Sequence, residues 1–164
     1  MYDDRICNIP PAARLSSTLS GMPDLDFAIL CEAARVADNL LFIHSAGWDT
    51  LSGPIGIAYP VTVALRLLLT RAECGRTHKL EIIVQGEDGE PLTKTDVGIS
   101  AAPPGVDVPP GWQIPVMASI RFPVMFRSYG LYSIEILFGN SSLKSLPLRF
   151  ASVPMPLRPD PPSA

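Results

Sequence analysis

The sequence predicts an all-β protein: an antiparallel two-sheet sandwich of about eight strands in a Greek-key-like order. Apolar and polar side chains alternate through most of residues 24–152, as they do on strands whose successive side chains point to opposite faces. Turn-forming stretches such as Gly86-Glu-Asp-Gly89 separate the alternating segments at fairly regular spacing. Segments with a helical period are almost absent. The length of 164 residues suits one domain with a sizeable core.

The two ends of the chain lack this alternation. Residues 1–23 contain Pro10-Pro11 and the cluster Ser16-Ser17-Thr18, and we expect them to form a loose N-terminal arm. Five prolines fall between Pro154 and Pro162, so residues 153–164 are expected to be an irregular or extended tail. The predicted sandwich domain therefore spans residues 24–152.

The first element, residues 25–36, is ambiguous. Its Ala, Leu, Glu and Arg residues favour a helix. Apolar residues nevertheless alternate along one face, at Leu25, Phe27, Ile29, Cys31 and Ala33. Asp38-Asn39 is typical of a turn, and residues 40–46 are typical of a returning strand. We therefore favour a hairpin here and leave a helix open as the alternative.

Alternation predicts the remaining strands at residues 61–69, 79–85, 93–99, 114–126, 130–138 and 146–150. The strand at 93–99 is more polar and is expected at a sheet edge. Because proline cannot donate to a sheet ladder, Pro115 and Pro123 indicate strand ends, edges or bulges. We expect the core to contain Val63, Leu65, Leu67, Ile82, Val84, Ile120, Tyr132, Ile134, Ile136 and Leu148.

Two segments carry a resemblance to a known family. The stretch from Leu30 through Asp38-Asn39 to Trp48, together with the Gly130-x-Tyr132 pattern, resembles an uncharacterised bacterial family of small β-sandwich proteins of immunoglobulin-like or C2-like type. The resemblance covers residues 25–150 and implies a fold but no activity. It also implies that the Tyr132 hydroxyl anchors a corner of the sandwich, although the inter-sheet cysteine pair of antibody domains is absent.

Charge and cysteine content narrow the class of function. The net charge is −3 and no Lys/Arg run occurs, which argues against a nucleic-acid or membrane-surface binder. Three cysteines, Cys7, Cys31 and Cys74, are an odd number without framework spacing, so a reduced, cytoplasmic setting is expected. The first residues do not resemble a signal peptide, and no apolar run is long enough to span a membrane.

The residues for catalysis are few, and we assign none as catalytic. His44 and His78 are the only histidines, so a hydrolase or a small-ligand binder would use one of them near Trp48. No Gly-x-Ser-x-Gly elbow is present. His44 follows Ile43 in a predicted strand and is more typical of half-buried packing.

Metal and cofactor sites are not expected either. Cys74-x-x-x-His78 has ligand-type residues, but zinc needs three or four protein ligands. A calcium-dependent, C2-like module is a further alternative, because such folds gather carboxylates at one end. The loop acids here stand singly, without an Asp-x-Asp pair, at Asp49, Asp88, Asp96 and Asp107.

Surface composition favours an interaction role. Charged residues make up only 18% of the chain, below the usual quarter, as in a protein partly covered by a partner or another copy. The leading hypothesis is a non-enzymatic protein-interaction or self-assembly module, a homodimer or higher oligomer, acting in an unknown process. An edge strand such as 92–99 could pair across a two-fold axis.

Four residues are candidates for contacting the partner. Trp48 and Trp112 lie beside glycine at strand boundaries, where each is either a buried plug or an exposed anchor. Met117 and Met125 share the less apolar face of residues 114–126 with two prolines. That face is either an adaptable binding surface or is covered by the N-terminal arm.

Overall fold

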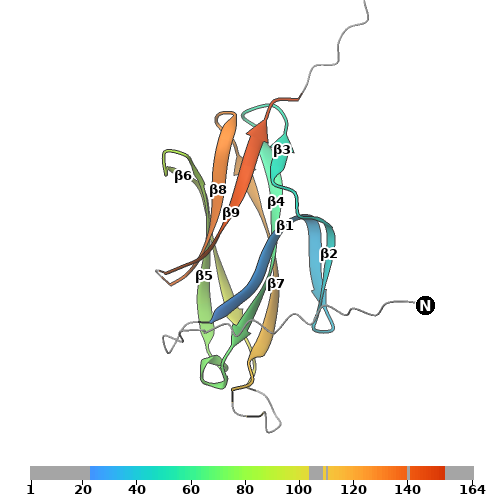
Figure 1. Cartoon of the computed structure of the whole chain (residues 1–164), viewed down its shortest axis with the longest axis vertical. Helices are drawn as coiled ribbons and strands as arrows, with labels where there is room; N and C mark the ends of the chain where they lie inside the picture. The colour runs from blue at the N-terminus through green and yellow to red at the C-terminus, as the bar shows by residue number, and fades with distance from the viewer. Residues whose placement is uncertain (1–22, 104–108, 110, 140, 154–164) are drawn as a thin grey trace, which may run out of the picture.

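A computed structural model describes residues 23–103, 109, 111–139 and 141–153, so residues 1–22 of the predicted arm and 154–164 of the predicted tail lie outside the described residues. Two β-sheets pack face to face (Figure 1). The four-stranded sheet has the order β2-β1-β4-β7 and the five-stranded sheet the order β3-β9-β8-β5-β6. The strands are β1 (Asp24–Ala37), β2 (Leu40–Ala46), β3 (Thr50–Ser52), β4 (Ala58–Leu69), β5 (Thr77–Gly86), β6 (Pro91–Ser100), β7 (Ile114–Met125), β8 (Gly130–Phe138) and β9 (Ser141–Ala151).

The predicted all-β sandwich is confirmed. All strand pairs are antiparallel within the described residues except β3 with β9, which is parallel. The connections β2–β3, β3–β4, β4–β5, β6–β7 and β7–β8 cross between the sheets, as in a Greek-key-like order. Strand β3 was not predicted, because three residues are too few to show a period.

The ambiguous segment 25–36 is a strand, since it lies inside β1. The turn that follows has positive φ angles at Asp38 (51°) and Asn39 (57°). Two such residues make the primed turn that joins two-residue hairpins, and aspartate and asparagine tolerate this conformation better than most side chains. The local turn chemistry thus outweighs the helix propensity of the preceding alanines and leucines.

The core lies between the two sheets. Every position expected in it is buried: Val63, Leu65, Leu67, Ile82, Val84, Ile120, Tyr132, Ile134, Ile136 and Leu148. An aromatic cluster closes the end at which β7 passes to β8. There Phe126 stacks on Phe150 with 4.2 Å between ring centroids, and Tyr132 meets Phe126 edge-on at 5.0 Å.

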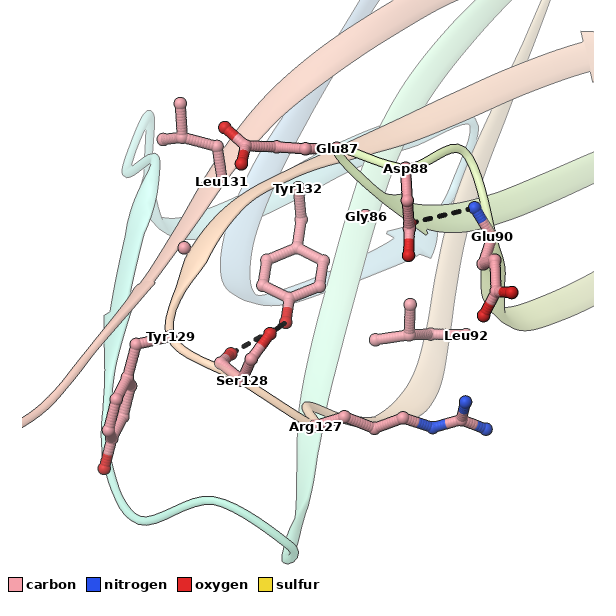
Figure 2. A pocket seen from close by; sticks show the side chains of 11 residues that line it. Gly86, Glu87, Asp88, Glu90, Leu92, Arg127, Ser128, Tyr129, Leu131 and Tyr132 are labelled. Atoms are coloured by element: carbon pink, nitrogen blue, oxygen red, sulfur yellow. Dashed lines mark hydrogen bonds between the residues drawn. The ribbon is translucent and has the colours of Figure 1, made fainter.

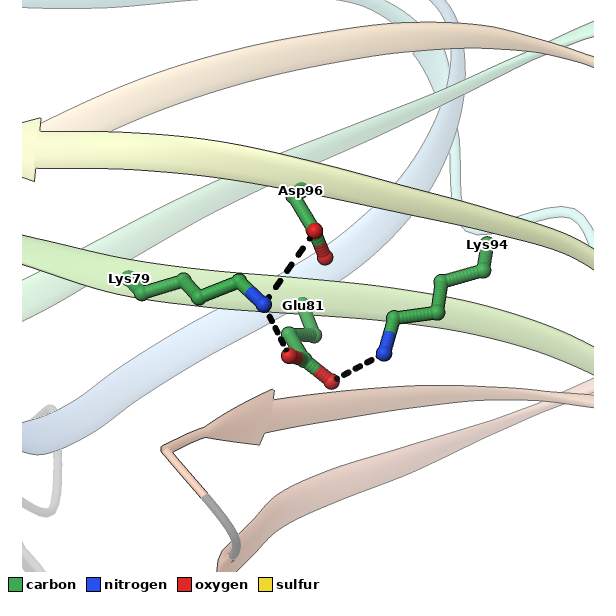
Figure 3. Close-up of polar contacts among 4 residues, drawn as sticks. All are labelled: Lys79, Glu81, Lys94 and Asp96. Atoms are coloured by element: carbon green, nitrogen blue, oxygen red, sulfur yellow. Dashed lines mark hydrogen bonds and ion pairs between the residues drawn. The ribbon is translucent and has the colours of Figure 1, made fainter.

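Two edge strands lie where proline residues and a polar strand had indicated them. β7, which carries Pro115 and Pro123, is an edge of the four-stranded sheet. β6, the polar strand, is an edge of the five-stranded sheet. On the outer face of β5 and β6, Glu81 accepts from Lys79 at 2.5 Å and from Lys94 at 2.9 Å, and Lys79 also reaches Asp96 at 3.2 Å (Figure 3).

Strand β1 belongs to two different pairings. Its first half, up to Cys31, pairs with β4, whereas its second half, from Cys31 to Ala37, pairs with β2. Cys31 lies opposite both Thr62 and Ala46, and the Gly47 amide donates to the Leu30 carbonyl at 2.9 Å. Residues 32–45 thus leave the sheet and return at one point. We call them the projecting hairpin; it lies outside the two packed layers (Figure 1).

Candidate interaction surface

The projecting hairpin contacts the outer face of the four-stranded sheet through its β1 strand. The Thr62 hydroxyl donates to the Glu32 carbonyl at 3.4 Å, and the Ser119 hydroxyl donates to the Ala34 carbonyl at 2.8 Å. Two backbone oxygens that face away from β2, those of Glu32 and Ala34, are therefore bonded to side chains of β4 and β7. The opposite edge of the hairpin, β2, has no strand beside it in the described part of the chain.

Both faces of the projecting hairpin carry apolar side chains. Directly opposed residues share a face, so one face carries the pair Val36 and Leu41, and the other carries the pair Arg35 and Phe42. The guanidinium carbon of Arg35 lies 5.0 Å from the centre of the Phe42 ring, within cation–π range. The large exposed side chains are Val36 (44%), Leu40 (59%), Phe42 (46%) and Ile43 (38%).

Two depressions accompany this surface. One, of about 240 Å³, lies on the hairpin itself, where Ala33 and Ala34 stand opposite His44 and Ile43. The other, of about 520 Å³, lies between the hairpin tip, the residues that follow β6, and the start of β7. Val36 and Met117 both line it. The hairpin tip is therefore only partly packed on the sandwich.

The structure separates the four partner-contact residues expected from sequence. Met117 is half-buried in the larger depression, whereas Met125 is exposed at the other end of β7, opposite Ala58. Trp48 is half-buried and packs against the core. Trp112 is 63% exposed, so it is not a buried plug. Their contact with a partner stays a prediction.

Sequence reasoning missed the apolar residues of the projecting hairpin as surface residues. The signal that could have found them is the unbroken run from Leu40 to Ile43. A sandwich strand with one solvated face alternates apolar and polar residues, whereas this run is apolar on both faces. Such a pattern is typical of a strand that is buried on both faces. β2 would be buried in this way only if a partner covered it.

His44 lies in this hairpin, and its geometry was predicted wrongly. Its side chain is 79% exposed rather than half-buried. Ser45 Oγ lies 3.0 Å from His44 Nδ1, and Glu32 Oε2 lies 3.5 Å from the same nitrogen. A serine–histidine–acid relay needs the serine and the acid on opposite ring nitrogens. Both contacts meet one nitrogen here, so this geometry does not form the relay.

His78 lies in β5, on the other sheet, and it is buried. Its Nε2 atom is 2.7 Å from the Glu73 carbonyl oxygen. The Cys74 thiol donates to the Thr70 carbonyl at 3.5 Å. The two ligand-type residues of the Cys74-x-x-x-His78 spacing are thus each bonded to the backbone. The Glu73 carboxylate, in the short 3₁₀ turn Arg71–Glu73, accepts from the Thr70 amide at 2.7 Å.

A cavity of about 270 Å³ lies at the end of the sandwich, between the β5–β6 and β7–β8 loops (Figure 2). The Tyr132 hydroxyl donates to the Ser128 carbonyl at 2.7 Å, so the expected corner bond is present. Asp88 accepts from the Glu90 amide at 3.1 Å, and Arg127 lies across from this loop (Figure 2). The Tyr132 hydroxyl and the Asp88 carboxylate on this cavity therefore bond to the loops themselves.

The acids expected for a calcium site lie apart. Asp49 accepts from the Thr50 hydroxyl, Asp88 caps its own loop, and Asp96 pairs with Lys79. Asp107 lies outside the described residues. Across the described ranges, no group of three or more His, Cys, Asp or Glu side chains is placed to hold a metal ion.

The surroundings of Glu81, Lys79 and Cys31 shift the pKa values of these groups. The pKa of Glu81 lies below its ordinary value because Lys79 and Lys94 donate to its carboxylate. The pKa of Lys79 is raised because Glu81 and Asp96 accept from its ammonium group. Burial raises the pKa of the Cys31 thiol, as expected of an unreactive structural cysteine. None of these groups lies among the exposed apolar residues of the hairpin.

The fold and this surface define a small β-sandwich with an apolar hairpin outside its two layers. The chain belongs to DUF6941, a family of unknown function, whose sequence profile matches residues 26–151. That segment runs from β1 to the last residue of β9 and includes the projecting hairpin. No curated protein matches the chain, and no solved structure matches it.

Among the residues that the structure describes, no helix has the length and apolar character needed to cross a bilayer.

Proposed function

We propose that this chain is a non-enzymatic protein-interaction module that binds a partner protein, or another copy of itself, through the projecting hairpin. One observation carries the proposal: a two-stranded ribbon stands outside the sandwich with Val36, Leu40, Phe42 and Ile43 exposed. An isolated two-stranded ribbon is marginally stable in water and gains from a third strand or a covering surface. Large exposed apolar side chains gathered on both faces of one ribbon are typical of an interaction site.

The energies support a contact that combines side chains with backbone. Fully burying one such side chain contributes about 1.5–3 kcal/mol. The four exposed residues are already half-covered, so a partner would add about 3–6 kcal/mol in total. Association costs about 4–15 kcal/mol in lost motion. Side-chain burial alone therefore falls short, and the unpaired β2 edge supplies the further bonds that a stable complex needs.

We also propose that the sandwich is immunoglobulin-like and that the protein works in a bacterial cytoplasm. Strands β1, β4 and β7 form one layer, and β5, β8 and β9 lie together in the other; the first, second and fifth strands of an immunoglobulin sandwich face its third, sixth and seventh in the same way. The odd cysteine count favours a reducing compartment. Neither proposal assigns an activity, because function depends on sites and not on folds.

The test removes the projecting hairpin while keeping the sandwich. Cys31 and Ala46 are directly paired, so their α-carbons are about 4.5–5.5 Å apart and a two-residue Asn-Gly turn can replace residues 32–45. Partners that co-purify with the full chain would be identified, purified and titrated against both proteins. We expect the variant to unfold cooperatively and to lose at least about 100-fold in affinity, roughly 2.7 kcal/mol.

A matched control is Leu131→Lys, which alters an exposed apolar residue on β8, in the other sheet. Its affinity should equal that of the unchanged chain. Equal affinity of the hairpin-replacement variant and the full chain would show that the binding surface lies elsewhere.

A further inference from the structure

The edge strands of this sandwich differ in how they are protected against pairing. β6 carries Pro91 and Lys94, and β7 carries Pro115 and Pro123. Proline and lysine are the residues with which natural proteins protect sheet edges. β2 has neither, and it contains no Asp, Glu, Lys or Arg. The longest unprotected edge strand in the described residues is therefore β2, since β3 has only three residues.

We propose that the hairpin's partner is a second copy of this chain, with the two β2 strands paired antiparallel about a two-fold axis at Ile43. The proposal rests on the function proposed above and names its partner. Antiparallel pairing of identical strands is self-complementary, as a two-fold interface requires. Two ribbons of two strands then become one sheet of four, which satisfies the need of each ribbon for a further strand.

The backbone fixes which residues of β2 can form this ladder. Ala37 and Leu40 flank a two-residue turn, so they form a hydrogen-bonded pair with each other. Because the bonding direction alternates along an antiparallel strand, the N–H and C=O groups of Leu41 and Ile43 point away from β1. A two-fold axis at Ile43 lets the two copies of that residue exchange both bonds. Ser45 has a φ of 50°, so the extended segment ends there.

Side chains agree with this register. Phe42 would lie opposite the second copy's His44 on each side of the axis. Aromatic and apolar pairs of this kind stabilise antiparallel strands. No two like charges meet, because β2 carries no permanent charge. The nearest charged groups, Glu32 and Arg35, lie on β1, one strand farther from the axis.

Every residue of β2 except Leu41 is exposed. The hydroxyls of Thr62 and Ser119 hold the β1 edge of the hairpin against the sandwich. β2 is consequently the outer strand of the hairpin, and it lies to one side of both layers (Figure 1). The free edge is thus presented to solvent and not to the molecule's own sheets.

A charge exchange tests the axis directly. Ile43→Arg places two like charges opposite each other in this register. Sedimentation equilibrium should show that the variant's dimer dissociates at least about tenfold more readily than the dimer of the unchanged chain, a difference of roughly 1.4 kcal/mol. Ile43→Glu should do the same. An equimolar mixture of the two variants should restore dimers, because opposite charges then face each other. Leu131→Arg, at an exposed residue of β8 in the other sheet, should leave the dimer unchanged.

Disulfide trapping gives the register independently. In a chain with Cys7→Ser and Cys74→Ser, Ile43→Cys should form an inter-chain disulfide under mild oxidation, because the paired α-carbons are about 5.5 Å apart. Leu40→Cys should not, because its two copies are six positions apart along the ladder, about 20 Å. Equal trapping at both positions, or failure of the Arg and Glu variants to pair, would overturn this axis.

A strict monomer at the highest soluble concentration would overturn self-pairing altogether. The proposed function would still stand if the hairpin-replacement variant lost affinity for a different, purified protein. It would fall as well if no binding depended on the hairpin. The two proposals are therefore tested separately by the oligomeric state of the unchanged chain and by the affinity of the hairpin-replacement variant.

Discussion

The Ser119 hydroxyl donates a hydrogen bond of 2.8 Å to the Ala34 carbonyl oxygen, 85 positions earlier in the chain. Ser119 lies on β7, in the sandwich, and Ala34 lies on the projecting hairpin. Because the second half of β1 has no ladder with β4, this bond and the one from Thr62 to Glu32 attach the hairpin to the sheet beneath it. The orientation of the hairpin thus depends on side-chain hydroxyls.

Replacing this hydroxyl should loosen the hairpin selectively. Ser119→Ala leaves the Ala34 carbonyl without its donor, which costs about 0.5–1.5 kcal/mol for a bond of this type. We expect faster hydrogen exchange at the amides of residues 33–44 and unchanged exchange in β5 and β8. Ser142→Ala, at an exposed serine of β9, is the control. Uniform acceleration over the whole sandwich would contradict a local tether.

The corner bond of Tyr132 should contribute to global stability. Tyr132→Phe removes the hydroxyl that donates to the Ser128 carbonyl at 2.7 Å while keeping the ring that packs on Phe126. A loss of about 0.5–1.5 kcal/mol in the free energy of unfolding is expected, measured by urea denaturation. The same change at the exposed Tyr129 should cost less than about 0.5 kcal/mol. Equal effects at the two positions would argue against the corner.

Truncation at the centre of the core should be far more costly. Ile134 is fully buried on β8 and lies opposite Val84 and Leu146. Ile134→Ala should lower the free energy of unfolding by about 2–5 kcal/mol through lost burial and the cavity left behind. Leu131→Ala, at an exposed residue of the same strand, is the control. A loss well under about 1 kcal/mol would contradict the burial of Ile134 and would mean that the other face of β8 meets the core.

The ion pairs among Lys79, Glu81, Lys94 and Asp96 form a charged ladder on β5 and β6, and they should make the stability of the fold depend on pH. The pKa of Glu81 is lowered from its ordinary 4.5, so its stabilising effect is present above that pH and is lost as the pH falls through the folded-state pKa. The pKa of Lys79 is raised above 10.5, so its effect is present below that pH and is lost only at more alkaline pH.

Glu81→Gln measures this effect. The difference in unfolding free energy between the variant and the unchanged chain should be constant from mildly acidic to mildly alkaline pH. It should disappear once Glu81 is protonated, and it should shrink in high salt. A difference that survives full protonation of the carboxylates would show that the ladder does not act through charge.

Sequence periodicity predicts the sandwich well and the hairpin surface poorly, for physical reasons. Ile134, for example, lies between the polar residues Ser133 and Glu135, and such alternation indicates directly which face is buried in a two-layer fold. The projecting hairpin departs from that rule. Cys31 lies in both ladders of β1, and only the three-dimensional pairing shows that the chain exits the sheet there.

Individual side chains of the candidate site were harder to place than strands. His44 was expected to be half-buried because it lies in a strand, yet that strand stands outside the sandwich. Trp112 was left as plug or anchor, and its exposure excludes the plug. Sequence alternation tells which neighbours share a face; it does not tell whether the face meets a second layer.

The closed base formed by Cys31 and Ala46 has an evolutionary consequence. The pairing of β1 with β4 ends at Cys31, where the projecting hairpin begins. Substitutions and length changes between Cys31 and Ala46 are therefore expected to leave the sandwich core unchanged. Relatives could therefore diverge in what they recognise while keeping one scaffold. The same property makes the site suitable for grafting foreign recognition loops.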